Sequence, residues 1–114
     1  MDIDLLIEIT NFVSGTYDMT NVLLEKVYNE EDFTDNLKDF NSNIERIFEF
    51  IIFLNENGLD IPTRVILKAT NDLLNAVNNK DFIETIDSLE FEFKPCLEEM
   101  FNILKATIEK EEVH

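Results

Sequence analysis

The chain has 114 residues, enough for one domain with one core, so we expect residues 1–114 to form a single helical domain. Its 9 basic and 25 acidic residues give a net charge of −16, which repels nucleic-acid phosphates and anionic membrane surfaces. Because 45% of the residues are apolar, we expect a folded chain rather than a disordered acidic tail.

Three features bear on cellular location. No stretch approaches the ~20 consecutive apolar residues of a membrane span. A secretory signal needs a basic start, and the first basic residue here is Lys26. The single cysteine, Cys96, cannot form an internal disulfide, which fits a reducing compartment. We therefore expect a cytoplasmic protein, and the many Asn, Ile and Lys residues favour a bacterial or phage origin.

Apolar residues at alternating spacings of four and three predict a first helix over residues 2–28. A neighbouring row widens the apolar stripe to the breadth that is typical of a bundle helix. Gly15 lies inside this run, and glycine costs about 1 kcal/mol relative to alanine in a helix interior. We expect the helix to bend or break there. The stripe residues are Leu6, Thr10, Val13, Tyr17, Thr20, Leu24 and Val27.

The same periodicity predicts three more helices, over residues 32–57, 61–78 and 81–111. Gly58 is the expected C-terminal stop of the second helix. Pro95 falls inside the last run, where the stripe keeps its phase, so we expect a kink rather than a break. The connections are short, which favours antiparallel neighbours. The predicted fold is all-α: an antiparallel four-helix bundle whose last helix is kinked.

Residues 29–44 resemble residues 78–93, which suggests two similar helical hairpins. The matched pairs are Asn29 and Asn78, Asp32 and Asp81, Phe33 and Phe82, and Asp35 and Glu84. Asp32 and Asp81 are predicted helix N-caps, because each precedes a hydrophobic run and has an acid three residues later. Common ancestry and convergence on the same turn chemistry both explain the match. A tetratricopeptide-like array has a shorter period of about 34 residues, so we prefer a closed bundle.

The last third of the chain carries a resemblance to a known group. The residues are Asn78-Asn79-Lys80-Asp81-Phe82, followed by the run from Asp87 to Pro95. They resemble a segment of small uncharacterised acidic helical-bundle proteins of clostridia and related bacteria, which carry a similar Lys-Asp-aromatic turn. The resemblance implies a bundle and a bacterial origin. It implies no activity, cofactor or site residue.

Residues that carry catalysis or bind cofactors are scarce. The only histidine is His114, at the last position, which excludes His-based catalytic centres and the histidine ligands of a di-iron bundle. One cysteine excludes Cys-based zinc sites, and the two glycines form no phosphate loop. Acidic clusters at 30–32 and 109–112 resemble solvated helix ends more than cation sites. We expect no catalysis, no cofactor and no metal.

Three aromatic residues do not fit the core stripes. Phe50 and Phe53 lie on another side of their helix, which already has a full apolar face, and Phe91 lies among acidic residues. A helix that is apolar all round is buried all round. Either the chain's own helices cover these rings, or the rings form a dimer interface or a docking surface for a partner protein.

The leading hypothesis is therefore a non-catalytic protein-binding module, acting as an adaptor, chaperone or regulatory subunit through Phe50, Phe53 and Phe91. A partner protein and a homodimer are both compatible with this hypothesis, whereas nucleic acid and membrane are not expected partners. One alternative is an acidic mimic of DNA that occupies a nucleic-acid-binding protein. Another is an enzyme that uses carboxylates and a metal ion.

Overall fold

The computed structural model describes residues 1–112, and every regular element in this range is helical. The first three helices are α1 (Ile3–Tyr28), α2 (Thr34–Glu56) and α3 (Thr63–Asn78). The fourth, which we call the C-terminal rod, joins α4 (Phe82–Asp87), the π-helix η1 (Ser88–Phe93) and α5 (Lys94–Glu112). The all-α prediction is confirmed, and each predicted boundary lies within two residues of the observed one.

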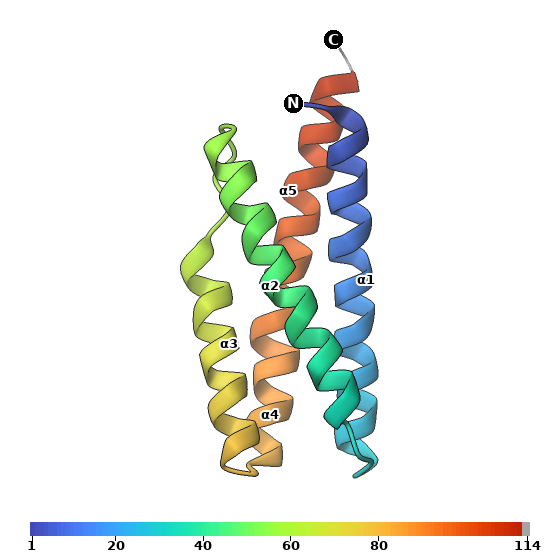
Figure 1. The fold of residues 1–114 in the computed structure, drawn as a ribbon, viewed down its shortest axis with the longest axis vertical. Coiled ribbons are helices and arrows are strands. Elements are labelled where there is room, and N and C mark those ends of the chain that lie inside the picture. Colours follow the sequence, from blue (N-terminus) through green and yellow to red (C-terminus); the bar gives the residue numbers. More distant parts are fainter. Residues whose placement is uncertain (113–114) are drawn as a thin grey trace.

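The four helices alternate in direction and pack closely against one another (Figure 1). α1 packs along α5, and α3 packs along α4 and η1, while α2 starts beside the end of α1 and slants across the front of the C-terminal rod (Figure 1). The start of α1 and the end of α5 lie at one end of the molecule, and the α1–α2 and α3–α4 turns lie at the other (Figure 1). Within residues 1–112, no helix is long and apolar enough to cross a membrane.

The core is built from the predicted stripes. Phe40 of α2 and Phe93 of η1 are both fully buried, and their rings meet edge to face with centroids 5.1 Å apart. Such aromatic pairs stabilise a fold beyond the area they bury. Other core residues are Leu6, Ile9 and Val13 of α1, Ile44, Ile47, Ile51 and Leu54 of α2, Ile66 and Leu73 of α3, and Leu89, Leu97 and Leu104 of the C-terminal rod.

The predicted break at Gly15 is wrong, because α1 runs without interruption from Ile3 to Tyr28. Glycine keeps its backbone hydrogen bonds in a helix and loses only side-chain contacts and chain entropy. The neighbouring Val13 and Thr16 are fully buried. Their packing against the other helices outweighs the roughly 1 kcal/mol that glycine costs.

The C-terminal rod passes through Pro95 without a gap in helical structure. The turn before the proline is a π-helix, in which the backbone N–H of Lys94 donates to the carbonyl of Leu89. Proline has no N–H, and its ring clashes with the carbonyl four residues earlier in a regular α-helix. The wider π turn accommodates the ring while keeping both sides of the stripe in the core.

The two turns at the far end share one backbone conformation. Glu30 and Lys80 follow their helices with positive φ values of 56° and 54°. The next residue in each turn, Glu31 or Asp81, donates its N–H to a carbonyl of the last helical turn, that of Lys26 or Ala76, at 2.9 Å. These are Schellman-type helix ends. Gly58 ends α2 in the same way, with φ of 97°, as predicted.

The start of the following helix differs between the two turns. Asp81 is the N-cap of α4, and its carboxylate accepts a hydrogen bond from the Glu84 N–H at 3.1 Å. Asp32 is not the N-cap of α2, because that helix begins only after Phe33. Its carboxylate instead accepts from the N–H and the hydroxyl of Thr34, at 3.0 and 2.7 Å. The first turn is two residues longer, so one helix start is capped and the other is not.

The two aspartates therefore differ in what they contribute to stability. We expect Asp81→Ala to lower the free energy of unfolding by about 1 kcal/mol, the usual effect of losing an N-cap. Asp32→Ala should cause a smaller loss, since its hydrogen bonds stay within an exposed loop. Thermal unfolding of the two variants side by side checks this difference. Equal losses would show that the two turns are stabilised alike.

Candidate functional site

The structure does not bring the three predicted aromatic residues together. Phe50 is half-buried, and its ring meets the ring of Phe12 on α1 edge to face at 5.5 Å. The guanidinium of Arg46 lies 5.3 Å from the centre of the same ring. Because α2 packs against α1, Phe50 has a neighbour that its own stripe does not reveal. Phe50 is therefore part of the packing between α1 and α2.

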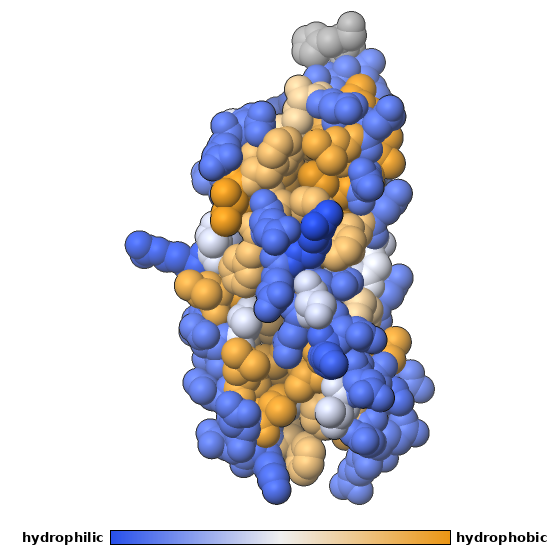
Figure 2. Space-filling model, viewed as in Figure 1, coloured by the Kyte–Doolittle hydropathy of each residue, from blue (hydrophilic) through white to orange (hydrophobic). Residues whose placement is uncertain are grey.

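The other two rings remain exposed and lie apart. Phe53 is 36% exposed and Phe91 is 69% exposed. Phe91 precedes the buried Phe93 by two residues, so its ring leaves the C-terminal rod on roughly the opposite side from the face that α2 covers. Figure 2 shows that apolar side chains on the α2 face gather in separate areas, with a polar band along α2 between them. No single aromatic surface joins the three residues.

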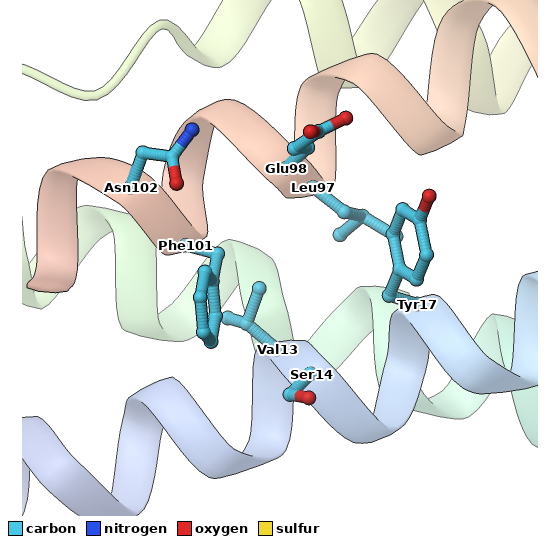
Figure 3. A pocket seen from close by; sticks show the side chains of 7 residues that line it. All are labelled: Val13, Ser14, Tyr17, Leu97, Glu98, Phe101 and Asn102. Atoms are coloured by element: carbon cyan, nitrogen blue, oxygen red, sulfur yellow. The ribbon is translucent and has the colours of Figure 1, made fainter.

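A concavity lies elsewhere, between α1 and α5. It has a volume of about 310 Å³. In Figure 3, Val13 of α1 and Phe101 of α5 approach each other across the gap, and Tyr17 faces Leu97 one turn further along. The polar groups of Ser14, Glu98 and Asn102 stand at its edges. The lining residues are Val13, Ser14, Tyr17, Leu97, Glu98, Phe101 and Asn102.

A second hollow continues the first toward the chain ends. Its volume is about 360 Å³, and Phe101 lines both hollows, so they lie next to each other along α1 and α5; we call the pair the α1–α5 groove. On α1 the groove extends from Ile7 to Tyr17, a length of about 15 Å at the helical rise per residue. The second hollow is lined by Ile7, Thr10, Asn11, Phe101, Lys105, Ile108, Glu109 and Glu112.

The α1–α5 groove combines an apolar floor with a charged edge. Lys105 places its ammonium 5.6 Å from the centre of the Phe101 ring. Lys94 lies at the same distance from the Tyr17 ring and also pairs with Glu90, with Nζ and Oε1 3.4 Å apart. A cation over an aromatic face is attracted electrostatically by the quadrupole of the ring. The remaining edge is acidic, with Glu98, Glu109 and Glu112.

Periodicity alone could not find the α1–α5 groove. Tyr17 belongs to the first stripe and Phe101 lies beside the last, so both read as ordinary core residues in the sequence. The groove exists because short side chains, Thr10, Asn11 and Ser14, lie on the α1 wall opposite the large Phe101 ring. That juxtaposition joins residues far apart in the chain. No local sequence pattern therefore indicates the groove.

Another group of charged residues connects two helices and does not form a site. The ammonium of Lys68 on α3 donates to Asp72 at 2.7 Å and to Glu92 of η1 at 2.8 Å. These hydrogen bonds raise the pKa of Lys68, and the bond from Lys68 lowers the pKa of Asp72. Lys68 and Asp72 therefore stay charged at neutral pH, and the hydrogen bond from Lys68 to Glu92 links α3 to the C-terminal rod. Exposed pairs of this kind contribute little to stability.

Residues 1–112 contain no group of three side chains that could hold a metal ion. The one histidine, His114, lies outside the described residues. The acidic residues at 30–32 and 109–112 stand near helix ends, as solvated charges do.

Cys96 is partly buried beside Ile51, Ile61 and Ile66. Burial, and to a smaller extent the nearby Glu99, raises the pKa of its thiol to about 11. The thiolate is the reactive form, so at pH 8 we expect iodoacetamide to react on the order of a hundredfold more slowly than with an ordinary cysteine. Unfolding in urea should restore the normal rate. Equally fast reaction in the folded protein would mean that the thiol is exposed.

Comparison with protein-family models, with curated proteins and with solved structures finds no match to this chain. The resemblance of residues 78–95 to clostridial bundle proteins therefore stays a prediction. The function has to be inferred from the geometry of the surface and from the charge that surrounds it.

Proposed function

We propose that the chain is a non-catalytic protein-binding module, an adaptor, chaperone or regulatory subunit, whose α1–α5 groove holds a helix of a partner protein. The observation that carries the proposal is the pair of adjacent hollows between α1 and α5, which share Phe101. Ligand sites in proteins are concave and mainly apolar, with a few polar groups at the edge. The α1–α5 groove has that composition and offers aromatic rings as anchors.

A helix is the occupant that fits this shape. The groove is bounded by two antiparallel helices that pack along each other, and a third helix packs into such a groove by placing its side-chain ridges between theirs. About 15 Å corresponds to nearly three helical turns, enough for apolar residues at positions i, i+3 or i+4, and i+7. The acidic edge favours a partner helix with basic residues beside its apolar stripe.

Two matched serine substitutions test the site. Ser14 lines the groove, whereas Ser42 is an exposed serine on the outer side of α2. Immobilised wild type and Ser42→Arg should retain the same protein from cells that produce the chain, and Ser14→Arg should lose it. Circular dichroism shows whether each variant is folded. Equal retention by all three proteins would contradict the α1–α5 groove as the contact.

Self-association is the second form that partner binding can take. The charge of −16 opposes contact between two copies, and salt weakens that repulsion. Since Phe50 is covered by Phe12, we expect the wild type to sediment as a monomer at both low and high salt. A dimer that strengthens with salt and disappears in Phe53→Ser would instead make α2 a dimer interface.

We also propose that the two hairpins arose by duplication and that the C-terminal rod bends at Pro95. The shared left-handed residues Glu30 and Lys80 support the duplication, although the helix starts that follow differ. The π-helix immediately before Pro95 supports the bend, because inserted or widened turns are a common cause of helix kinks. Spin labels at the two ends of the rod, with and without Pro95→Ala, would measure it.

A further inference from the structure

The two Asp-Phe turns converge on one end of the molecule. The antiparallel arrangement places the α1–α2 and α3–α4 turns together at the end away from both chain termini (Figure 1). Between them lies a hollow of about 280 Å³, which we call the turn-end groove. Phe33 from the first turn and Phe82 from the second both line it. The full set of lining residues is Val27, Glu30, Glu31, Asp32, Phe33 and Phe82.

Several apolar side chains at this end of the molecule are left in water by the fold. Phe82 is 58% exposed, and its neighbours at this end, Tyr28 and Ile83, are 62% and 76% exposed. The start of α4 does not need these side chains, because Asp81 caps the helix through its own carboxylate. Exposed apolar residues grouped around a concavity mark sites of interaction.

The rim of the turn-end groove is negative. Glu30, Glu31 and Asp32 are consecutive, and the one ion pair among them joins Glu31 to Lys26 with Nζ and Oε2 3.9 Å apart. The hydrogen bonds from Thr34 lower the pKa of Asp32, so its carboxylate stays charged at neutral pH. Three carboxylates beside two phenyl rings complement a basic segment that carries an apolar side chain.

We propose that the turn-end groove is a second docking site, which binds a basic segment of another protein through one apolar anchor set between positive charges. The anchor lies between Phe33 and Phe82, and the flanking lysine or arginine side chains meet Glu30, Glu31 and Asp32. The site shares no residue with the α1–α5 groove. Each site can therefore be tested, and rejected, independently of the other.

The chain contains no tryptophan. Binding of a peptide that contains tryptophan can therefore be followed by the fluorescence of the peptide alone. The probe is a short synthetic peptide with one tryptophan between lysines, and its counterpart has glutamates in place of the lysines. The lysine peptide should bind with a blue shift in emission, and salt should weaken it. The glutamate peptide should not bind. Binding of both peptides alike, or of neither, would overturn the proposal.

Two pairs of variants locate the binding. Phe82→Ser should weaken binding of the lysine peptide by about tenfold or more, whereas Phe91→Ser, which removes an even more exposed ring outside the groove, should change it by less than about twofold. Glu30→Gln/Glu31→Gln should weaken it at low salt more than Glu109→Gln/Glu111→Gln, which removes the same charge at the opposite end.

Equal effects within either pair would show unspecific attraction to an acidic surface and overturn the site. A larger effect of Glu109→Gln/Glu111→Gln would show that the peptide binds at the α1–α5 groove, which would also overturn the proposal. Self-association that requires Phe82 in the absence of peptide would make a second copy the occupant, again contrary to the proposal.

Discussion

Replacing Phe93 with alanine should lower the free energy of unfolding by about 3–5 kcal/mol, the usual range for a buried phenylalanine. The ring is fully buried and meets Phe40 edge to face, so it joins η1 to α2 across the core. Domains of this size have a total stability of about 5–15 kcal/mol. The variant should therefore unfold at much lower urea concentration than the wild type and be partly unfolded at elevated temperature.

Phe91→Ala is the matched control, because it removes the same ring from the same π-helix at a position that is 69% exposed. Phe91→Ala should lower the free energy of unfolding by no more than about 1 kcal/mol, as for most surface substitutions. In the double variant Phe40→Ala/Phe93→Ala, the losses should differ from the sum of the single ones by about 0.5–1.5 kcal/mol. Similar losses in Phe91→Ala and Phe93→Ala would mean that η1 is not placed against α2 as described.

Asn55→Ala should lower the free energy of unfolding by about 2 kcal/mol, through the loss of two hydrogen bonds. The side chain of Asn55, near the end of α2, accepts from the Ile61 N–H at 2.8 Å and donates to the Ile61 carbonyl at 3.1 Å. Ile61 is 4% exposed, and its side chain belongs to the core. Alanine leaves both backbone groups of a buried residue without these partners, which adds to the loss.

Asn57 supplies the control for this prediction. Its amide donates to the Phe53 carbonyl within the same helix end, at 2.8 Å, and the bond is exposed. Asn57→Ala should therefore cost no more than about 0.5 kcal/mol. Amide hydrogen exchange at Ile61 should accelerate in Asn55→Ala and not in Asn57→Ala. An unchanged exchange rate in Asn55→Ala would show that other contacts hold the connection between α2 and α3.

The helices themselves could be predicted because each depends on a local pattern. Periodic apolar residues located all four helices. Gly58 marked the end of α2, because the backbone there adopts a left-handed conformation, which glycine takes up most readily. The errors arise where neighbours in space decide the outcome. Gly15 does not break α1 because packing on either side outweighs its propensity. Asp32 does not cap α2, because the carboxylate of Asp32 accepts hydrogen bonds from Thr34 and the helix begins only after Phe33.

The candidate sites were harder to predict, for a related reason. The sequence identified Phe50, Phe53 and Phe91 as off-stripe residues, but only the packing of α2 against α1 decides that Phe50 is covered. The α1–α5 groove depends on short side chains of α1 facing Phe101 of α5. The sequence did single out the Asp-Phe turns, although as helix caps. Their convergence on one groove follows from the antiparallel topology, which the sequence also predicted.

Photo-crosslinking in the cells that produce the chain tests the binding function most directly. A photoreactive phenylalanine analogue is placed either at Asn102, in the α1–α5 groove, or at Asn71, an exposed position on α3. We expect Asn102 to yield one dominant covalent adduct with another protein, lost when Ser14→Arg is added, and Asn71 to yield none. Adducts of the same size and strength from both positions, or an adduct at Asn102 that persists with Ser14→Arg, would contradict the assignment of this groove as the partner-binding site.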